Sequence, residues 1–405
     1  MKVLLLTNEY PPHIYGGAGV HVEFLSRELA QLPGVDVEVR AFGTQHADEP
    51  HLRVRGYGVD TSQFTAPPYL QPVFGAIQRD IAFAATDVDA DIVHCHTWYT
   101  NLAGVLIQRA YGIPFVMTTH SLEPLRPWKR EQLRGGYDLS LWIEQTALRE
   151  ADAVVAVSEG TRADILRVSD ARPERVHVIY NGIDVNLYRP TPAADVLARY
   201  GIDPERPYVL FVGRITRQKG IVHLVRAIPA IDASAQIVLC AGAPDTPEIA
   251  AEMEQAVAAA QAARDGIFWL QEMVERETVV KLYSGAAVFC CPSIYEPFGI
   301  INLEAMACET AVVASAVGGI PEVVVDGETG VLVPLAQQQA SPFEPLDPAA
   351  YSRDLATAIN QLLADPARRE RMGAAGRRRV EEHFSWRAIA RQTAELYRGL
   401  VASDE

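Results

Sequence analysis

Two glutamates, Glu296 and Glu304, flank an apolar segment, and their types and spacing suggest a binding or catalytic site. The run AAVFCCPS before them predicts a buried strand, and EPFGIINLEAMA continues through a proline-containing turn into a helical pattern. A helix that begins near Gly299 leaves its first backbone N–H groups unpaired, at the positive end of the helix dipole. We therefore expect an anion such as a phosphate to bind at this helix start.

Glu304 falls about one turn into the same helix, among apolar residues. A carboxylate that is buried without a partner is costly or shifts its pKa. We therefore expect Glu304 to have a hydrogen-bonding or ionic partner. The alternative is that Glu296 and Glu304 both face solvent.

Two cations, Arg214 and Lys219, follow a predicted strand in the segment VGRITRQKG. In a parallel sheet this position places fixed positive charge at the carboxyl edge of the strands. Such charge can neutralise a diphosphate without a metal ion. The alternative is a solvated basic loop, and the anion-binding helix start at Gly299 in the same half of the chain favours the phosphate site.

A glycine pair, Gly16 and Gly17, separates the first predicted strand, KVLLL, from a helix with apolar Val20, Phe24 and Leu29. Residues without a Cβ let a ligand approach the backbone at a helix start. A plain tight turn explains the same pattern, because the segment lacks the full GxGxxG fingerprint.

His94 and His96 alternate on a predicted strand, so their side chains lie on one face. An HxH pair can bind zinc, but no third or fourth ligand occurs at usable spacing, so we expect no metal site. Trp98 and Tyr99 follow, and their flat faces suit either contact with a sugar ring or packing in the core.

A basic loop follows His120, which ends the predicted strand PFVMTT. Its cations, Arg126, Lys129, Arg130 and Arg134, are unusual in a chain with a net charge of −15. They indicate either a solvated helix face or a site for an acceptor that carries a phosphate. The loop has no Ser-His-Asp arrangement.

Strands alternate with helical segments along most of the chain, which predicts an α/β protein with two doubly wound parallel sheets. A segment rich in Pro, Asp and Gly, NGIDVNLYRPTPAADVLARYGIDPERP, predicts a linker region between them. We expect Rossmann-like domains at 1–185 and 200–385. Ligands bind beyond the carboxyl ends of such strands, where His96, His120 and Ser158 are predicted to fall.

Length and charge restrict the remaining possibilities. A chain of 405 residues suits two domains, and its acidic balance argues against nucleic acid or anionic membranes as general partners. Five cysteines without CxxC spacing predict buried free thiols in a cytoplasmic protein. Neither a signal-peptide core nor a run of apolar residues long enough to cross a membrane is present in the sequence, so we expect no integral membrane contact.

With these residues in view, the chain resembles the retaining glycosyltransferases of family 4, which have two Rossmann-like domains facing a central cleft (the GT-B fold). The resemblance covers nearly the whole chain and rests on YGGAGVHV, TTHS, YNGID, VGRITRQKG, EPFGIINLE and VGGIPE. The segments HCHTWYTNLAG, HSLEPLRPWKREQL and VLCAGAPDTPEIA look like the actinobacterial-type glycogen synthases, a group identified with synthesis of α-maltose 1-phosphate.

The resemblance implies a nucleotide-sugar donor, ADP-glucose by preference, bound mainly by the second domain without a metal or other cofactor. Glu304 would then bind the ribose, Glu296 the glucose, and Arg214 and Lys219 the diphosphate. It also implies that the terminal helix, 386–402, packs back onto the first domain. The implied catalytic residues are His120, Arg214, Lys219 and Glu296. The implied donor-binding residues are Gly16, Gly17, Met273, Val274, Phe298, Gly299, Ile300, Ile301 and Glu304. The expected acceptor-binding residues are Trp98, Tyr99, Arg126, Lys129, Arg130 and Arg134.

The resemblance leaves several functions open. The acceptor is glucose 1-phosphate, which gives α-maltose 1-phosphate, or it is the end of an α-glucan chain, as in a glycogen synthase. The same motifs also suit a peripheral lipid glycosyltransferase or a non-catalytic nucleotide-sugar sensor. Retention could use a carboxylate nucleophile, for which Glu123 is the nearest candidate to His120, but we favour attack from the leaving-group side. The donor base and the oligomeric state, with a homodimer among the choices, are not fixed by the sequence.

Overall fold

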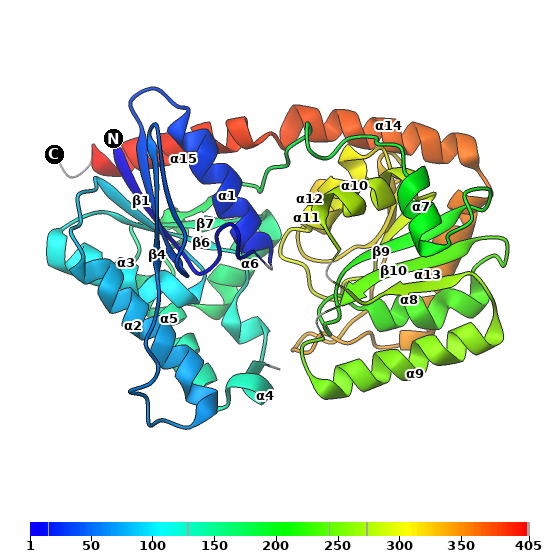
Figure 1. Ribbon diagram of the computed structural model, residues 1–405, viewed down its shortest axis with the longest axis horizontal. Helices are drawn as coiled ribbons and strands as arrows, with labels where there is room; N and C mark the ends of the chain where they lie inside the picture. Colours follow the sequence, from blue (N-terminus) through cyan, green and yellow to red (C-terminus); the bar gives the residue numbers. More distant parts are fainter. Residues whose placement is uncertain (15, 128, 243, 273, 403–405) are drawn as a thin grey trace. The chain divides into compact units, whose positions relative to one another are not determined.

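A computed structural model describes residues 1–14, 16–127, 129–242, 244–272 and 274–402. The chain forms two compact units (Figure 1). The N-terminal unit comprises Met1–Gly182 together with Trp386–Glu405, and the C-terminal unit comprises Ile183–Ser385. The chain therefore passes from one unit to the other twice, after Gly182 and after Ser385.

The N-terminal unit contains a sheet of strand order β3-β4-β2-β1-β5-β6-β7-β8. Every pairing is parallel except that of β3 with β4, which is antiparallel. Its strands are β1 (Lys2–Thr7), β2 (Asp36–Phe42), β3 (His46–Glu49), β4 (Leu52–Tyr57), β5 (Ile92–His96), β6 (Phe115–Thr119), β7 (Ala153–Ala156) and β8 (Val176–Val178). The sequence predicted β1, β2, β5, β6 and β7. It missed β3, β4 and β8, because β3 is a largely exposed polar edge strand and β8 has only three residues.

The helices of this unit cover both faces of its sheet. Figure 1 shows α1 and α15 on one face and α2, α3 and α5 on the other. The helices are α1 (Gly17–Ala30), α2 (Gln71–Ala85), α3 (Trp98–Tyr111), α4 (Lys129–Leu133), α5 (Gly135–Glu150), α6 (Glu159–Val168) and α15 (Trp386–Val401), with short 3-10 turns η1 (Pro68–Leu70), η2 (Glu123–Leu125) and η3 (Pro173–Arg175).

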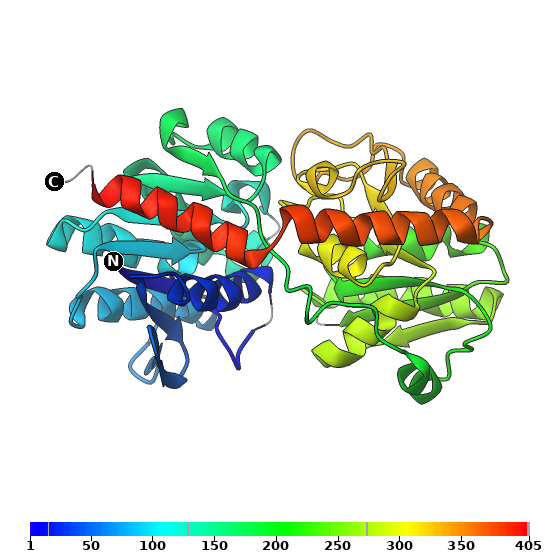
Figure 2. The ribbon, with the colours of Figure 1, turned by 90° about the horizontal axis from the view of Figure 1, so that it is seen from above.

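Helix α15 packs on α1, although the two are separated by most of the chain (Figure 2). Its buried residues recur every three or four positions, which gives one apolar face. The Trp386 ring stacks on Phe24 with ring centroids 5.7 Å apart. A Cβ at Gly182 would come within 2.6 Å of the Trp386 ring, so only glycine lets the chain pass there.

The C-terminal unit contains an all-parallel sheet of order β11-β10-β9-β12-β13-β14. In chain order this is 3-2-1-4-5-6, the Rossmann arrangement, whose strand order reverses between β9 and β12. All six strands were predicted from the sequence. They are β9 (Tyr208–Arg214), β10 (Gln236–Gly242), β11 (Ile267–Leu270), β12 (Val288–Cys291), β13 (Val312–Ser315) and β14 (Gly330–Val333).

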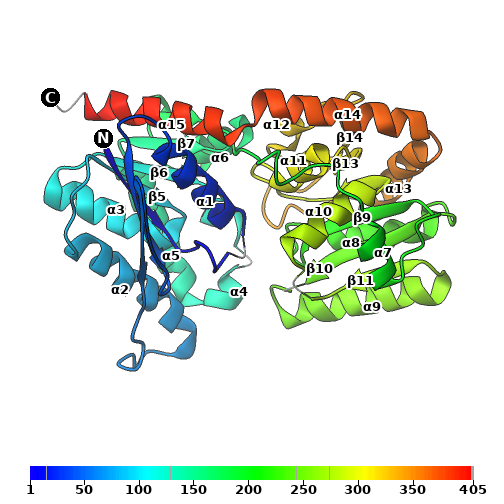
Figure 3. The same cartoon turned by 45° about the horizontal axis from the view of Figure 1, so that its top comes forward.

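Helices again lie on both faces of this sheet (Figure 3). They are α7 (Ala194–Tyr200), α8 (Ile221–Ala227), α9 (Pro247–Ala263), α10 (Arg276–Gly285), α11 (Ile300–Ala307), α12 (Ile320–Val323), α13 (Pro348–Leu363) and α14 (Pro366–His383), with the 3-10 turn η4 (Ile228–Ala230). Helix α7 lies inside the predicted linker region, where Pro and Gly masked a short helical pattern. The prediction of an α/β fold with two Rossmann-like domains is confirmed.

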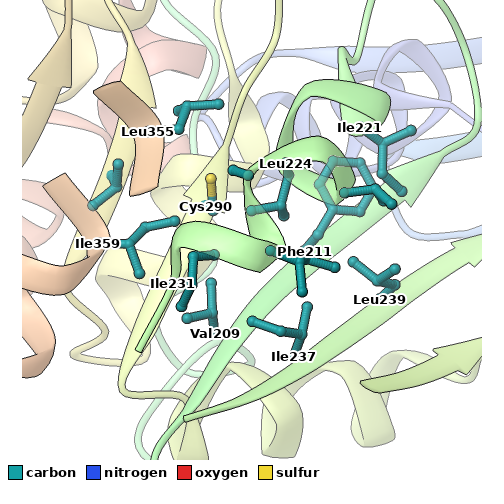
Figure 4. Close-up of a cluster of buried hydrophobic side chains, with 14 of the residues drawn as sticks. Val209, Phe211, Ile221, Leu224, Ile231, Ile237, Leu239, Cys290, Leu355 and Ile359 are labelled. Carbon is teal, nitrogen blue, oxygen red and sulfur yellow. The ribbon is translucent and has the colours of Figure 1, made fainter. Parts of the chain in front are cut away.

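The main core of the C-terminal unit lies between its sheet and helices α8, α9 and α13 (Figure 4). Phe211 on β9, Leu239 on β10 and Ile359 on α13 are each fully or almost fully buried. Burying such a side chain contributes about 1.5–3 kcal/mol relative to leaving it exposed. Strands β9 and β12 both contribute side chains to this core, and both lead into the candidate site.

Two further expectations concern cysteines and membranes. The five cysteines are free and buried, as predicted. None of the helices in the described part of the chain combines the length and the apolar character that a membrane span needs.

Candidate active site

Lys219 and Glu296 form the central ion pair of the C-terminal unit. The Lys219 Nζ donates a hydrogen bond to the Glu296 Oε2 over 2.6 Å, and both side chains are largely buried. The Ser293 hydroxyl donates to the same carboxylate oxygen at 3.2 Å. The alternative in which Glu296 faces solvent is therefore wrong, and the cation and the carboxylate expected at this site lie in direct contact.

This contact follows from the strand order. Lys219 comes from the loop after β9 and Glu296 from the loop after β12, and these strands are neighbours at the reversal of the sheet. Gly220 closes the first loop with a φ of +59°, and a Cβ there would come within 2.1 Å of the Pro292 carbonyl oxygen. The Ile294 N–H donates to the Gln218 carbonyl at 3.0 Å and joins the two loops.

Arg214, the last residue of β9, is more exposed than Lys219 and is paired with a different carboxylate. Its guanidinium donates to the Asp245 carboxylate at 3.2 Å, while its side chain remains 43% exposed. An anionic ligand can therefore reach this cation, although Asp245 offsets part of its charge.

Helix α11 begins at Ile300, close to the predicted start. Its N-cap, Gly299, has a φ of +97°, and a Cβ there would come within 2.6 Å of the Asn302 side-chain nitrogen. The helix has no side-chain cap, so its first N–H groups, including those of Ile300 and Ile301, point out of the helix without an intrahelical partner. Phe298 is buried beside Phe384 and shapes the turn from within.

Glu304 has the partner that its apolar surroundings require. The Tyr283 hydroxyl donates to its Oε2 at 2.9 Å, and the Tyr188 hydroxyl is a second hydrogen-bond partner. Burial raises the pKa of Glu304, and the two tyrosine hydrogen bonds oppose that rise. The carboxylate is partly buried, so the alternative in which it is simply solvated is wrong.

The expected base-binding segment lies between β11 and α10. Val274 is half-buried there. Met273, the other residue expected at this position, lies outside the described residues.

In the N-terminal unit, His120 belongs to a cluster of four histidines with His21, His94 and His96. His96 ends β5, His120 directly follows the neighbouring strand β6, and His21 lies near the start of α1. The His96 Nδ1 and the His120 Nε2 are 3.1 Å apart, and the His21 Nδ1 donates to the Asn181 Oδ1 at 2.6 Å.

The histidines of this cluster are held in their neutral form. Burial lowers the pKa of His21 to about 4, with the Asn181 hydrogen bond opposing it. Burial, reinforced by the neighbouring histidines, lowers the pKa values of His94, His96 and His120 well below their ordinary value.

The sequence did not show that His21 and His120 lie beside the HxH pair, or that the Nε2 atoms of His21 and His96 have no hydrogen-bond partner among the described residues. His21, His96 and His120 each offer one nitrogen, and these three atoms lie within 4.8 Å of one another. The expectation of no metal site stays a prediction, although the fold brings a third histidine nitrogen close to these two. Sequence spacing did not reveal this cluster, because His21 and His96 are distant in sequence and come from different elements.

The glycine pair lies at the start of α1, as predicted. Gly16 is the N-cap and Gly17 the first helical residue. The Gly16 N–H donates to the Glu9 Oε2 at 2.8 Å, so a carboxylate of the chain already lies at this helix start. Glu9 is a residue that sequence analysis did not single out.

The basic loop of the N-terminal unit has extensive internal ion pairs. Lys129 donates to Glu123 at 3.1 Å, and Arg126 lies 3.8 Å from the same carboxylate. Both cations are largely buried, and the Nε of Arg126 is buried without a hydrogen-bond partner among the described residues. The Glu123 N–H in turn donates to the Glu144 carboxylate at 2.9 Å. Burial, followed by repulsion from Glu123, raises the pKa of Glu144 well above its ordinary value.

The other two cations of the loop differ from this pair. Arg130 is exposed and binds the Asp138 carboxylate through both of its terminal nitrogens. Arg134 lies over the Tyr69 ring, 5.1 Å from its centroid. The solvated-face alternative therefore fits Arg130, whereas Arg126 and Lys129 form a buried cationic pair around Glu123.

Trp98 belongs to the hydrophobic core, where it is 3% exposed. Its face stacks on Tyr99 with ring centroids 4.1 Å apart, so it is not open to a sugar. Of the two alternatives for Trp98, core packing is the one the structure shows. Tyr99 is half-buried and packs its edge against Phe42.

Comparison with known proteins gives matches in both units. Residues 15–187 match Glycosyltransferase Family 4, and residues 195–342 match Glycosyl transferases group 1. The α-maltose-1-phosphate synthase of Mycolicibacterium smegmatis is 49% identical, over 99% of this chain and 100% of its own length. The protein of the same name from Mycobacterium tuberculosis is 50% identical over the same shares. The solved structure of a sucrose-phosphate synthase from Thermosynechococcus elongatus has a TM-score of 0.80 and 29% identity, with both chains fully covered.

Proposed function

The chain belongs to the family 4 glycosyltransferases with two Rossmann-like domains, and we propose that it transfers glucose from ADP-glucose to glucose 1-phosphate. The product is α-maltose 1-phosphate, a precursor for α-glucan synthesis. The observation that carries this proposal is the identity of about half of all residues, over nearly the full length of both chains, to α-maltose-1-phosphate synthases.

We assign the donor mainly to the C-terminal unit. The diphosphate is bound by Arg214, Lys219 and the free N–H groups at the start of α11, because phosphate oxygens accept hydrogen bonds from cations and amides. Hydroxyl groups donate to carboxylates, so Glu296 binds the glucose and Glu304 the ribose. The Lys219–Glu296 contact supports this assignment, since the residue that we assign to phosphate lies beside the residue that we assign to the sugar.

We assign the acceptor phosphate to Arg126 and Lys129 of the N-terminal unit. These two cations lie at one carboxylate, that of Glu123, and both belong to the basic loop. The orphan Nε of Arg126 is a donor for which a phosphate oxygen is a suitable partner. The exposed Arg130 and the core residue Trp98 leave the acceptor-binding set. His120 keeps its assignment to the donor sugar, and the buried thiols fit a reducing compartment such as the cytoplasm.

Retention of configuration requires either a nucleophile on the enzyme or attack from the leaving-group side. Glu123 is 1% exposed and ion-paired with Lys129, so its carboxylate is already committed to a structural contact. We therefore propose attack from the leaving-group side. The acceptor hydroxyl forms the new C–O bond, the bond from glucose to the diphosphate breaks, and the departing phosphate takes the acceptor's proton.

The test combines two donors with two acceptors. ADP-glucose and UDP-glucose are each offered with glucose 1-phosphate or with glycogen, and the product mass is measured. We expect the fastest reaction with ADP-glucose and glucose 1-phosphate, giving the mass of maltose 1-phosphate. Elongation of glycogen without turnover of glucose 1-phosphate would identify a glucan synthase instead, and a preference for UDP-glucose would refute the donor assignment.

A further inference from the structure

The histidine cluster of the N-terminal unit has a property that sugar transfer does not use. We propose that His21, His96 and His120 form a binding site for a divalent transition cation of the zinc type, and that occupation of this site inhibits the enzyme. The three side chains come from α1 and from the ends of β5 and β6. Each offers a ring nitrogen, and the three nitrogens lie within 4.8 Å of one another.

Two unpartnered nitrogens point to a ligand. The Nε2 atoms of His21 and His96 are buried and have no hydrogen-bond partner among the described residues. Because the His21 Nδ1 donates to the Asn181 amide oxygen, its Nε2 is the unprotonated nitrogen with a free lone pair. A buried polar atom without a partner is energetically unfavourable, so a cation that accepts this lone pair relieves an existing penalty.

The surroundings also prepare the rings as metal ligands. Metals bind the lone pair of a neutral imidazole, and the Nε2 atoms of His21 and His96 have no hydrogen-bond partner among the described residues that would occupy it. The hydrogen bond from His21 to Asn181 fixes both the tautomer and the ring orientation, as outer-shell partners do in known metal sites.

The ligand set selects the class of cation. Three imidazoles without a carboxylate in the group suit Zn²⁺, Co²⁺, Ni²⁺ or Cu²⁺ rather than Mg²⁺ or Ca²⁺, which prefer oxygen. Tetrahedral zinc bonds to nitrogen of roughly 2.0–2.1 Å place neighbouring nitrogens about 3.3 Å apart, so the rings must move closer together on binding. The fourth position then remains for water.

His94 provides an internal contrast. It touches the His96 ring, with centroids 4.3 Å apart, but both of its nitrogens are occupied. The Nδ1 is bonded to the Tyr397 hydroxyl at 2.6 Å and the Nε2 to the Thr118 hydroxyl at 2.7 Å. His94 is therefore adjacent to the site without being a ligand.

Inhibition follows from the role of His120 and rests on the proposed function. If His120 binds the donor sugar, a cation on its ring competes with ADP-glucose. Chelators then relieve the inhibition by the metal ion, and they leave the basal activity unchanged. Binding itself requires only the N-terminal unit's three histidines, so it is measured separately from turnover.

The experiment titrates the metal-free full-length protein with Zn²⁺ by calorimetry and with Co²⁺ by visible absorption. We expect a single ion per chain and the intense bands of four-coordinate Co²⁺. His21→Gln and His96→Gln should each weaken binding by roughly tenfold or more, since even outer-shell changes reach that size. His51→Gln, which removes an exposed histidine paired with Asp36, should leave binding unchanged.

Two further measurements keep the proposal open to refutation if a buried variant folds poorly. X-ray absorption of the zinc-loaded wild-type protein should show three imidazole ligands, and fewer would overturn the site. Absence of Zn²⁺ binding, or equal binding by the wild type and by folded His21→Gln and His96→Gln variants, would overturn it as well. Zinc binding that saturating ADP-glucose leaves unchanged would reject the competitive mechanism, whereas failure of the proposed transfer reaction would leave the binding result intact.

Discussion

Replacement of Lys219 by alanine tests the centre of the candidate site. Lys219 is the cation that lies 2.6 Å from Glu296, and its side chain is 19% exposed against 8% for the glutamate. In the proposed reaction this cation stabilises charge that develops on the departing diphosphate. We therefore expect the Lys219→Ala protein to bind acceptor normally and to turn over slowly.

The substitution is expected to change two quantities, the turnover and the melting temperature. Loss of one donor to a developing oxyanion lowers turnover by about 10²–10³-fold. Removal of one partner from a buried ion pair costs about 3–5 kcal/mol, and the partial exposure of Lys219 places this pair at or below the lower end. For a unit of this size, each kcal/mol lowers the melting temperature by roughly 2–4 °C, so we expect melting to fall by several degrees.

Control variants separate the two effects. Lys281→Ala removes a lysine of similar exposure, 17%, that is paired with Asp195 and Glu277 in the same unit. We expect this variant to keep its turnover. The double variant Lys219→Ala/Glu296→Gln removes the unpaired carboxylate charge, so it should regain much of the lost melting temperature and remain slow.

The assay measures kcat at saturating ADP-glucose, at a temperature below the melting transition of each variant. Near-normal turnover of Lys219→Ala would refute the role of this cation. A loss of turnover that follows melting temperature across the Lys219→Ala and Lys281→Ala variants would show that Lys219 acts only through stability.

Three further predictions concern the donor, pH and metal. Glu304→Ala should chiefly raise the KM for ADP-glucose, and steady-state kinetics with an unchanged KM would remove the ribose assignment. Because the pKa of His21 is about 4 in the folded protein and near 6.5 when unfolded, the unfolded chain binds protons first as pH falls. The free energy of unfolding should therefore be highest above pH 6.5 and should fall by about 3 kcal/mol as the pH is lowered to 4. Melting temperatures that stay constant across that pH range would contradict this prediction. Treatment with EDTA should leave activity intact, whereas a loss restored by a divalent ion would overturn the metal-free reaction.

Local pattern was sufficient for much of the fold. Apolar runs such as those of β9, β10 and β12 are long enough to show as buried strands, and their alternation with helices determines a parallel sheet. The edge strand β3 escaped because it is polar and largely exposed, and β8 escaped because it has only three residues. Helix α7 escaped for a different reason, since turn-forming residues surround it on both sides.

The candidate site, too, was predicted only in part from the sequence. Sequence spacing placed Arg214, Lys219, Glu296 and Glu304 at strand ends and around a helix start, because those positions depend on local periodicity. It did not reveal that Lys219 and Glu296 touch, since that contact joins loops 77 residues apart. It also did not reveal that Tyr283 supports Glu304.

By itself, the sequence determined the two α/β domains, the family and the residue types available for phosphate and hydroxyl groups. These depend on periodicity and on motifs that are local to the chain. Only the tertiary structure decided which charges meet: Lys129 with Glu123, Lys219 with Glu296, and His21 with His96 and His120. The physical reason is that burial and pairing determine the charge of each group and whether it has a hydrogen-bonding position left for a ligand. Burial and pairing arise only where distant segments pack together.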